Sequence, residues 1–431
     1  MDNPLYRIRD ITLFPGIGDG VALPVVKDAE VHVRDGRFTY AGVKDGAPRL
    51  SGACDIQGRG MVLMPAFVNA HAHSAMTLLR GAGAGLPLDR WLYEVIFPME
   101  KRLTAEWAKT GIELAILEYL ACGVTCVNDM YMFPELTARA MGESGMRALI
   151  TNACVDFGNG REQLRDALRF YHDFHGSYDG RVRAGVSVHA EYTSTPGLVE
   201  QVVNKTAGLD NVAHVHVSET KKEVAGCIKR HGVSPVRYFH NLGLFQMPAI
   251  AAHCVAVSDE DLAILSRDRV TVALNPVSNL KLGSGTAPVD RMKKAGVRLA
   301  IGTDGAASND NLDLFEEMKC TALLCKKNRF QITPAEVLMA AAADGARAMG
   351  FDLLGVIREG WKADCVLLDV SAPNICPAED IPGAAVYAAR GDNVRMTMAS
   401  GRVLYRDGEY LTMDRERILY EAKNAASKLR A

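Results

Sequence analysis

Short apolar runs alternate with amphipathic segments through the middle of the chain. Eight runs have strand length and are mostly apolar on both faces, as in strands buried within a parallel sheet. They are residues 61–70, 123–130, 146–155, 183–192, 211–219, 248–257, 270–276 and 298–305. Segments between them, such as 105–123 and 195–207, carry apolar residues at helical spacing. This alternation predicts an α/β fold, a distorted (β/α)₈ TIM barrel. A doubly wound sheet is the weaker alternative, because no Gly-x-Gly-x-x-Gly motif follows the first strand.

The two ends of the chain have a different pattern of predicted elements. Residues 1–60 and 355–412 read as short strands broken by turns, and Asp-Gly pairs at 35–36 and 407–408 indicate hairpins. We therefore predict a small β-sandwich domain formed by both termini, from residues 1–60 and 355–431, around a catalytic barrel of residues 61–354. The last residues of the chain have the periodicity of a surface helix.

Composition and charge exclude several classes of protein. The chain has 431 residues, of which 48% are hydrophobic and 23% charged, with a formal net charge of -2, so nothing favours a nucleic acid or a membrane as partner. The N-terminus lacks the apolar core of a signal peptide, and no run has transmembrane length. The ten cysteines never form a Cys-x-x-Cys pair. Reduced thiols in a cytoplasmic protein are the expected state.

Polar side chains gather where the predicted strands end. His71 and His73 follow the first apolar run, and because alternate residues of a strand share a face, they are expected to point the same way. In a barrel, the carboxyl ends of the strands form the active-site rim. A single histidine there is more often a packing residue, whereas the pair indicates a metal site.

Four other strands end in comparable residues. These are His189 on the fourth, His216 and Glu219 on the fifth, His253 on the sixth and Asp304 on the eighth. A buried carboxylate such as Asp304 needs a partner or a metal. Imidazoles combined with one carboxylate suit Zn²⁺, with Fe²⁺ or Mn²⁺ as alternatives. Without a metal, the same groups would have to satisfy one another by hydrogen bonding.

The motifs at these positions resemble those of the amidohydrolase superfamily. They are HAH at 71–73, HVSET at 216–220, HC at 253–254, NPVSNLKLGSG at 275–285 and GTDG at 302–305. The resemblance extends over nearly the whole chain. It is closest to the methylthioadenosine/S-adenosylhomocysteine deaminase-like group, within the branch that deaminates purines and triazines.

The resemblance implies a role for each residue of the cluster. One zinc ion per subunit would be held by His71, His73, His216 and Asp304. Asp304 would also accept a proton from the metal-activated water, and His253 would orient that water. Glu219 would protonate the substrate ring and then the departing amine. The fourth strand carries no lysine that could bridge two metals, which favours a single metal.

Substrate-binding residues are also implied by the resemblance. Trp91, Glu100 and His189 would contact the nucleoside, with Glu100 accepting the ribose hydroxyls. From the residues alone, the preferred interpretation of Glu100 is a surface helix residue paired with Lys101 or Arg102. Relatives that accept S-adenosylhomocysteine read its carboxylate with two arginines. Here Arg161 matches one, but Asn152 stands at the other position, which favours adenosines with a small or neutral 5′ group.

The predicted function is metal-dependent hydrolytic deamination of adenine nucleosides: 5′-methylthioadenosine, 5′-deoxyadenosine, adenosine or S-adenosylhomocysteine. The alternatives on the same metal site are a deaminase of a free purine or pyrimidine base or an s-triazine, and a cyclic-amide or dechlorinating hydrolase. A barrel retained as a non-enzymatic scaffold is disfavoured by the full ligand set. The sequence leaves the oligomeric state open: a homo-oligomer is one alternative, and dimers are the commonest oligomers.

Overall fold

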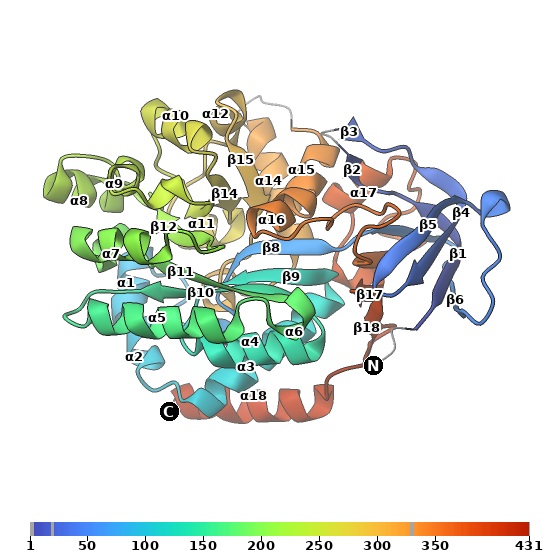
Figure 1. The fold of residues 1–431 in the computed structure, drawn as a ribbon, viewed down its shortest axis with the longest axis horizontal. Helices are drawn as coiled ribbons and strands as arrows, with labels where there is room; N and C mark the ends of the chain where they lie inside the picture. Colours follow the sequence, from blue (N-terminus) through green and yellow to red (C-terminus); the bar gives the residue numbers. More distant parts are fainter. Residues whose placement is uncertain (1–3, 19–20, 328–331, 431) are drawn as a thin grey trace.

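The computed structural model describes residues 4–18, 21–327 and 332–430, which form a barrel flanked by a separate sheet (Figure 1). The barrel contains eight strands: β8 (Phe67–Ala72), β9 (Val124–Asp129), β10 (Arg147–Cys154), β11 (Val182–Val188), β12 (Ala213–Val217), β13 (Ala249–His253), β14 (Thr271–Leu274) and β15 (Arg298–Ile301). They pair in parallel as two four-stranded sheets, β8 to β11 and β12 to β15.

Two parallel β-bridges close these sheets into a ring. One joins Ala72, at the end of β8, to Asp304, just past β15. The other joins Ala190, just past β11, to His216 on β12. The predicted (β/α)₈ barrel is therefore confirmed, and its two halves meet at residues of the predicted metal site.

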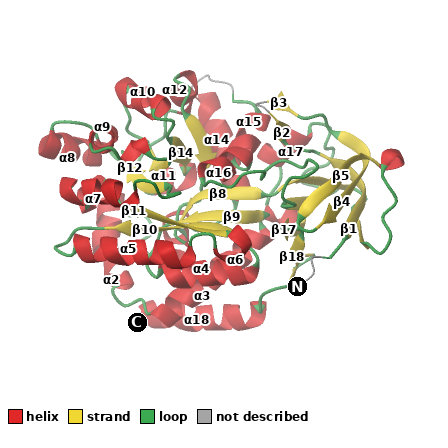
Figure 2. Cartoon of the chain, viewed as in Figure 1, coloured by secondary structure: helices red, strands yellow, loops and turns green. Residues whose placement is uncertain are grey.

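Helices surround the strands on the outside of the barrel (Figure 2). In chain order the described helices are α1 (Leu88–Arg90), α2 (Phe97–Glu100), α3 (Ala105–Ala121), α4 (Pro134–Ser144), α5 (Gly160–Phe174), α6 (Ser177–Gly180), α7 (Pro196–Thr206), α8 (Lys221–His231), α9 (Pro235–Asn241), α10 (Asp259–Arg267), α11 (Pro276–Lys281), α12 (Val289–Lys294), α13 (Ala306–Asn309), α14 (Leu314–Lys327), α15 (Pro334–Ala340), α16 (Ala343–Ala348), α17 (Ile381–Tyr387) and α18 (Arg415–Arg430). A π-helical turn, Trp91–Ile96, joins α1 to α2. Within the described part of the chain, none of these helices combines the length and apolar character needed to cross a membrane.

The flanking sheet has nine strands, contributed by both ends of the chain. They are β1 (Tyr6–Leu13), β4 (Val26–Arg34), β5 (Arg37–Val43), β6 (Cys54–Gln57), β7 (Met61–Pro65), β16 (Cys365–Asp369), β17 (Val394–Ala399), β18 (Arg402–Arg406) and β19 (Glu409–Tyr410). A separate pair, β2 (Ile17–Gly18) and β3 (Val21–Ala22), lies beside it. The run predicted as one strand over 61–70 is two: β7 joins this sheet, and β8 begins the barrel after Ala66. The flanking sheet thus extends past the domain boundary predicted at residue 60.

The terminal helix α18 packs against α3, below the barrel in Figure 1. Its buried residues, Ile418, Ala422, Ala425 and Leu429, follow helical spacing. At its last residue, the Arg430 guanidinium donates to the carbonyl of Arg80, in the loop that follows β8. The end of α18 is therefore tied to a loop of the active-site end.

A buried ion pair fastens the barrel to the flanking sheet. Arg147, the first residue of β10, makes two hydrogen bonds of 3.1 Å to the carboxylate of Asp364, which immediately precedes β16. Arg147 also donates to the Ser400 hydroxyl at 2.6 Å, and the Ser400 amide donates to Asp364 at 2.8 Å. Both charged groups are buried, so each depends on the other for compensation.

We predict that Asp364→Ala lowers the free energy of unfolding by about 3–5 kcal/mol, because it leaves the Arg147 charge buried without a partner. Urea denaturation measures the loss. The double variant Arg147→Met/Asp364→Leu should recover most of the stability, since it removes both charges. Equal losses in the single and double variants would contradict this account.

Candidate metal and catalytic site

Four of the predicted metal ligands lie together at the carboxyl end of the barrel strands. His71 on β8 and His73 just beyond it place their Nε2 atoms 3.5 Å and 3.2 Å from Asp304 Oδ1. His216 on β12 places its Nε2 3.4 Å from His73 Nε2. The structure therefore brings together three imidazoles and one carboxylate from three strands.

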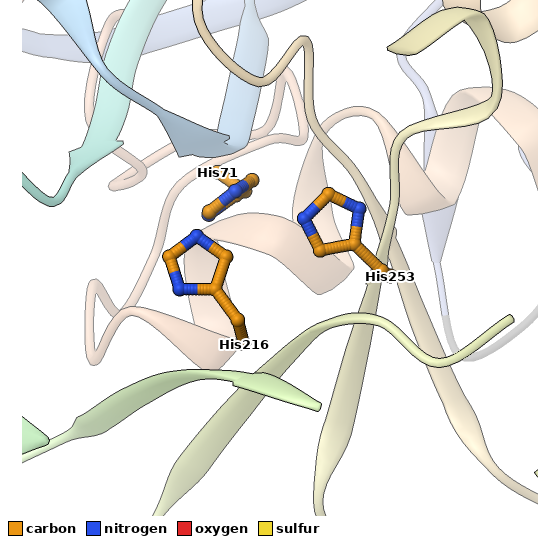
Figure 3. A group of neighbouring side chains, drawn as sticks. All are labelled: His71, His216 and His253. Atoms are coloured by element: carbon orange, nitrogen blue, oxygen red, sulfur yellow. The ribbon is translucent and has the colours of Figure 1, made fainter. Parts of the chain in front are cut away.

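These donors fit a divalent metal ion. Ligand atoms of His71, His73 and Asp304 lie within 4.8 Å of one another, as do those of His71, His216 and His253. Figure 3 shows the rings of His71, His216 and His253 turned toward one another. His71 Nε2 is buried and has no hydrogen-bond partner, and a buried nitrogen of this kind needs one. A metal ion among these atoms would satisfy it.

Local irregularities of the backbone aim these side chains inward. Val68 and Ala70 belong to a core cluster that lines the strands, so strict alternation would turn His71 outward. The register of β8 against β9 is irregular between Asn69 and Ala72, and such a bulge re-aims a side chain. His253 and Asp304 have φ values of 73° and 61°. This left-handed conformation costs about 1–3 kcal/mol for residues other than glycine. Two residues of the site therefore hold a strained backbone conformation.

Electrostatics divide the imidazoles into two kinds. Burial lowers the pKa of His71 to about 3 and that of His216 well below its usual value, so both are neutral, the form that binds metals. For His73, burial opposes protonation, but the Asp304 carboxylate outweighs it and raises the pKa to about 9. Burial would raise the pKa of Asp304, yet contact with His71 and His73 holds it well below the usual range. In the absence of metal, the Asp304 carboxylate is balanced by a protonated His73. A bound metal cation would supply the balancing positive charge instead.

His214 lies directly behind His71. Its ring is fully buried. Its Nε2 lies 2.8 Å from His71 Nδ1. For His71 Nε2 to offer its lone pair to a metal, the proton must sit on Nδ1, which then donates to His214. The contact thus gives the Nδ1 proton of that tautomer an acceptor in His214 Nε2.

Glu219 and His253 stand beside the proposed ligands. His253 Nε2 is 3.9 Å from Glu219 Oε2. Burial raises the pKa of Glu219, which favours a protonated carboxyl group. The Glu219 backbone is held by Glu223, whose carboxylate accepts from the amides of Ser218 and Glu219 at 2.8 Å and 2.7 Å. A fixed acidic group thus lies next to a histidine at the mouth of the barrel.

Two of the predicted substrate-binding residues adjoin this cluster. His189 packs against His216, with ring centroids 4.5 Å apart, and its carbonyl lies 2.9 Å from His216 Nδ1. Glu100, on α2, accepts a hydrogen bond of 2.7 Å from Tyr131, whose ring is 6.1 Å from that of His73. Burial raises the pKa of the Glu100 carboxyl. Glu100 is therefore a half-buried group near the site and is not paired with the cations that follow it on the surface.

Three other predicted residues make no hydrogen bond or ion pair with the cluster in the described part of the chain. Trp91 is buried and donates to the carbonyl of Ala82 at 3.0 Å. Asn152 is half-buried on β10, opposite Val186 of β11. Arg161 is exposed in the first turn of α5. Their roles remain predictions.

Sequence reasoning missed most of the groups that support the site. Tyr131 and Glu223 follow strands β9 and β12, and Ser278, Asn279 and Ser284 follow β14. The available signal was position: each lies in the segment that follows a strand, at the end where the ligands gather. Their residue types are too common for the sequence to distinguish them from loop-capping residues.

Comparisons with known proteins agree with this geometry. A model of the amidohydrolase family matches residues 62–404. A 5-methylthioadenosine/S-adenosylhomocysteine deaminase of Pelotomaculum thermopropionicum is 39% identical over 410 residues, covering 94% of this chain and 95% of the relative. A 5′-deoxyadenosine deaminase of Methanosarcina mazei is 39% identical, covering 97% and 96%. The crystal structure of an adenosine deaminase from Xanthomonas campestris with bound zinc has a TM-score of 0.94 and 31% identity, covering 100% of each chain.

We predict that His214→Leu weakens metal binding about 10–100-fold, because it removes the partner that orients His71. Metal retained against a graded series of chelators, measured by mass spectrometry, gives the affinity. His172→Leu, at an exposed position on α5, is the matched control and should bind as the wild type does. Circular dichroism verifies folding, and unchanged affinity in a folded His214→Leu variant would contradict the role.

Proposed function

This chain belongs to the amidohydrolase family, and we propose that it hydrolytically deaminates adenine nucleosides, releasing ammonia and the corresponding inosine. The observation that carries the proposal is the pairing of a buried acid, Glu219, with the cluster of imidazoles and Asp304 at one barrel mouth. The nucleoside deaminases that it resembles along almost its full length supply the substrate class. We further propose a cytoplasmic location, since its ten cysteines are all free.

We propose zinc as the metal, held by His71, His73, His216 and Asp304. Imidazoles with one carboxylate form a donor set that zinc accepts, and His73 would give up its proton when the metal binds. When bound, the metal supplies a water molecule acidic enough to lose a proton at neutral pH. The remaining chemistry belongs to the side chains.

The proposed reaction forms one C–O bond and breaks one C–N bond. The water oxygen adds to the ring carbon that bears the amino group, and Asp304 accepts the proton that the water loses. Glu219 donates a proton to the adjacent ring nitrogen, which neutralises the charge that addition places there. His253 hydrogen-bonds the attacking oxygen. Glu219, now deprotonated, takes the proton of the added hydroxyl as the C=O bond forms and passes it to the amino group, which leaves as ammonia. The proton held by Asp304 then restores Glu219.

For the 5′ end of the substrate we propose a small or neutral group. Methylthioadenosine, 5′-deoxyadenosine and adenosine fit this class, and S-adenosylhomocysteine ranks last. The carboxylate of S-adenosylhomocysteine would be bound best by charge-assisted hydrogen bonds from two cationic side chains. Here Asn152 is neutral, and Arg161 is an exposed cation beyond the same strand.

The test is ammonia release by zinc-loaded protein from a panel of compounds. The panel holds the four adenosines, guanine, cytosine and an s-triazine, read beside the adenine-to-hypoxanthine absorbance change. We expect turnover of the adenosines only. Asn152→Arg should raise activity on S-adenosylhomocysteine relative to methylthioadenosine about tenfold, the effect of one charged hydrogen bond, whereas Asn152→Gln should not. Turnover restricted to free bases or the triazine would overturn the substrate class.

We predict that Glu219→Gln retains the metal and lowers kcat by about 10²–10⁴-fold, because glutamine keeps the shape and loses the transferable proton. Metal content and kcat are measured on the same preparation. Glu191→Gln is unsuitable as a control, because Glu191 is buried and paired with Arg230. Glu260→Gln, at an exposed position on α10, serves instead. Wild-type turnover in Glu219→Gln would remove the proton-transfer role.

A further inference from the structure

The segment after β14, residues 275–285, is called here the β14 loop. It contains α11 and then turns back on itself at Gly283 and Gly285, whose φ values of 70° and 119° favour glycine. The amides of Ser284 and Gly285 both donate to the Asn279 carbonyl, at 2.9 Å and 3.4 Å. The two arms of the loop are therefore fixed relative to each other.

The first contact of this loop is with Asp304. The Ser278 hydroxyl donates to Asp304 Oδ2 at 2.6 Å, and the Ser278 side chain is fully buried. The other carboxylate oxygen, Oδ1, faces His71 and His73. Ser278 thus fixes the rotation of the carboxylate and leaves one oxygen directed at the proposed metal ligands.

The second contact is with His253. Asn279 Oδ1 lies 2.8 Å from His253 Nδ1, and Asn279 is buried. Because an amide oxygen only accepts, His253 carries a proton on Nδ1 and donates it to Asn279. Its Nε2 is then the atom that faces Glu219.

The third contact is with Glu219. The Ser284 hydroxyl donates to Glu219 Oε1 at 3.1 Å. The other oxygen, Oε2, is the one nearest His253. Ser284 therefore holds the proposed acid by the oxygen that does not face the histidine.

The β14 loop is itself anchored to the segment after β15. Lys281 Nζ donates to the Ala307 carbonyl at 3.1 Å and to Asp310 Oδ2 at 2.6 Å. The amide of Val277 donates to Glu317, a fully buried carboxyl group on α14, at 3.3 Å. An element tied at these points moves little, as is required of a group that positions others.

We propose that the β14 loop is a single positioning element for the proposed base, the orienting histidine and the proposed acid: Ser278 sets Asp304, Asn279 sets His253, and Ser284 sets Glu219. These residues touch no reacting atom and act through their partners. The proposal rests on the proposed function for its kinetic consequences, because those three partners are its proposed acid, base and orienting histidine.

The experiment measures kcat, KM, metal affinity and thermal unfolding for Ser284→Ala, Ser278→Ala and Asn279→Leu. Each should lower kcat about 10–100-fold and leave KM within about threefold of wild type. Ser278→Ala should also weaken metal binding about tenfold, since its partner is a proposed ligand, whereas Ser284→Ala should not.

Conservative variants separate positioning from folding. Ser284→Thr keeps the hydroxyl, and Asn279→Asp keeps an acceptor for His253, so both should restore most of the lost kcat. Thr286→Ala deletes an exposed hydroxyl immediately after the loop and is the matched control, with wild-type kcat expected.

Several results would overturn the proposal. One is wild-type kcat in Ser284→Ala. Another is an equal loss in Thr286→Ala, which would mean that the loop is merely sensitive to change. A third is Ser284→Thr as impaired as Ser284→Ala. If the wild type deaminates none of the nucleosides, the proposed function fails. The positioning of Asp304 is then still tested by the metal affinity of Ser278→Ala, where wild-type affinity would refute it.

Discussion

The burial of one carboxylate, that of Asp304, is the constraint on which the rest of the site depends. An ionised carboxylate in a barrel interior is strongly unfavourable unless charges or donors surround it. Here His71 and His73 face one oxygen, and Ser278 donates to the other. The same group keeps a proton on His73. The cluster is thus built around a negative charge that a metal cation would balance.

The residues that close the barrel include residues of the proposed metal site. The bridge between Ala72 and Asp304 and the bridge between Ala190 and His216 join the two half-barrels. Both bridges include a proposed metal ligand, and the strained φ of Asp304 occurs at one of them. Because barrel closure holds that backbone in place, strain at the site is offset by the packing of the whole sheet.

The sequence predicted the barrel because its strands are apolar on both faces, a pattern that depends on local residues alone. It also placed His71, His73, His216, Glu219, His253 and Asp304 at one end, because parallel strands of a barrel share one direction. It missed the split of residues 61–70 into β7 and β8, since both strands are apolar and only their partners differ. The roles of Ser278, Asn279, Ser284 and His214 were beyond it as well. A serine or histidine acquires such a role only from a neighbour brought close by the fold, and that neighbour is not encoded locally.

The environments of the Asp304 and Glu219 carboxyl groups support the proposed roles of Asp304 as base and Glu219 as acid. Asp304 contacts imidazoles that lower its pKa, so it is ionised and can accept a proton. Glu219 lies in a buried position that raises its pKa, so it can hold a proton and donate it. Groups whose surroundings push their pKa values apart serve as base and acid at the same pH. Because the β14 loop holds one oxygen of each carboxylate, a single rigid segment sets the distance between the donor and the acceptor of protons. The loop therefore couples the position of the proposed acid to that of the proposed base.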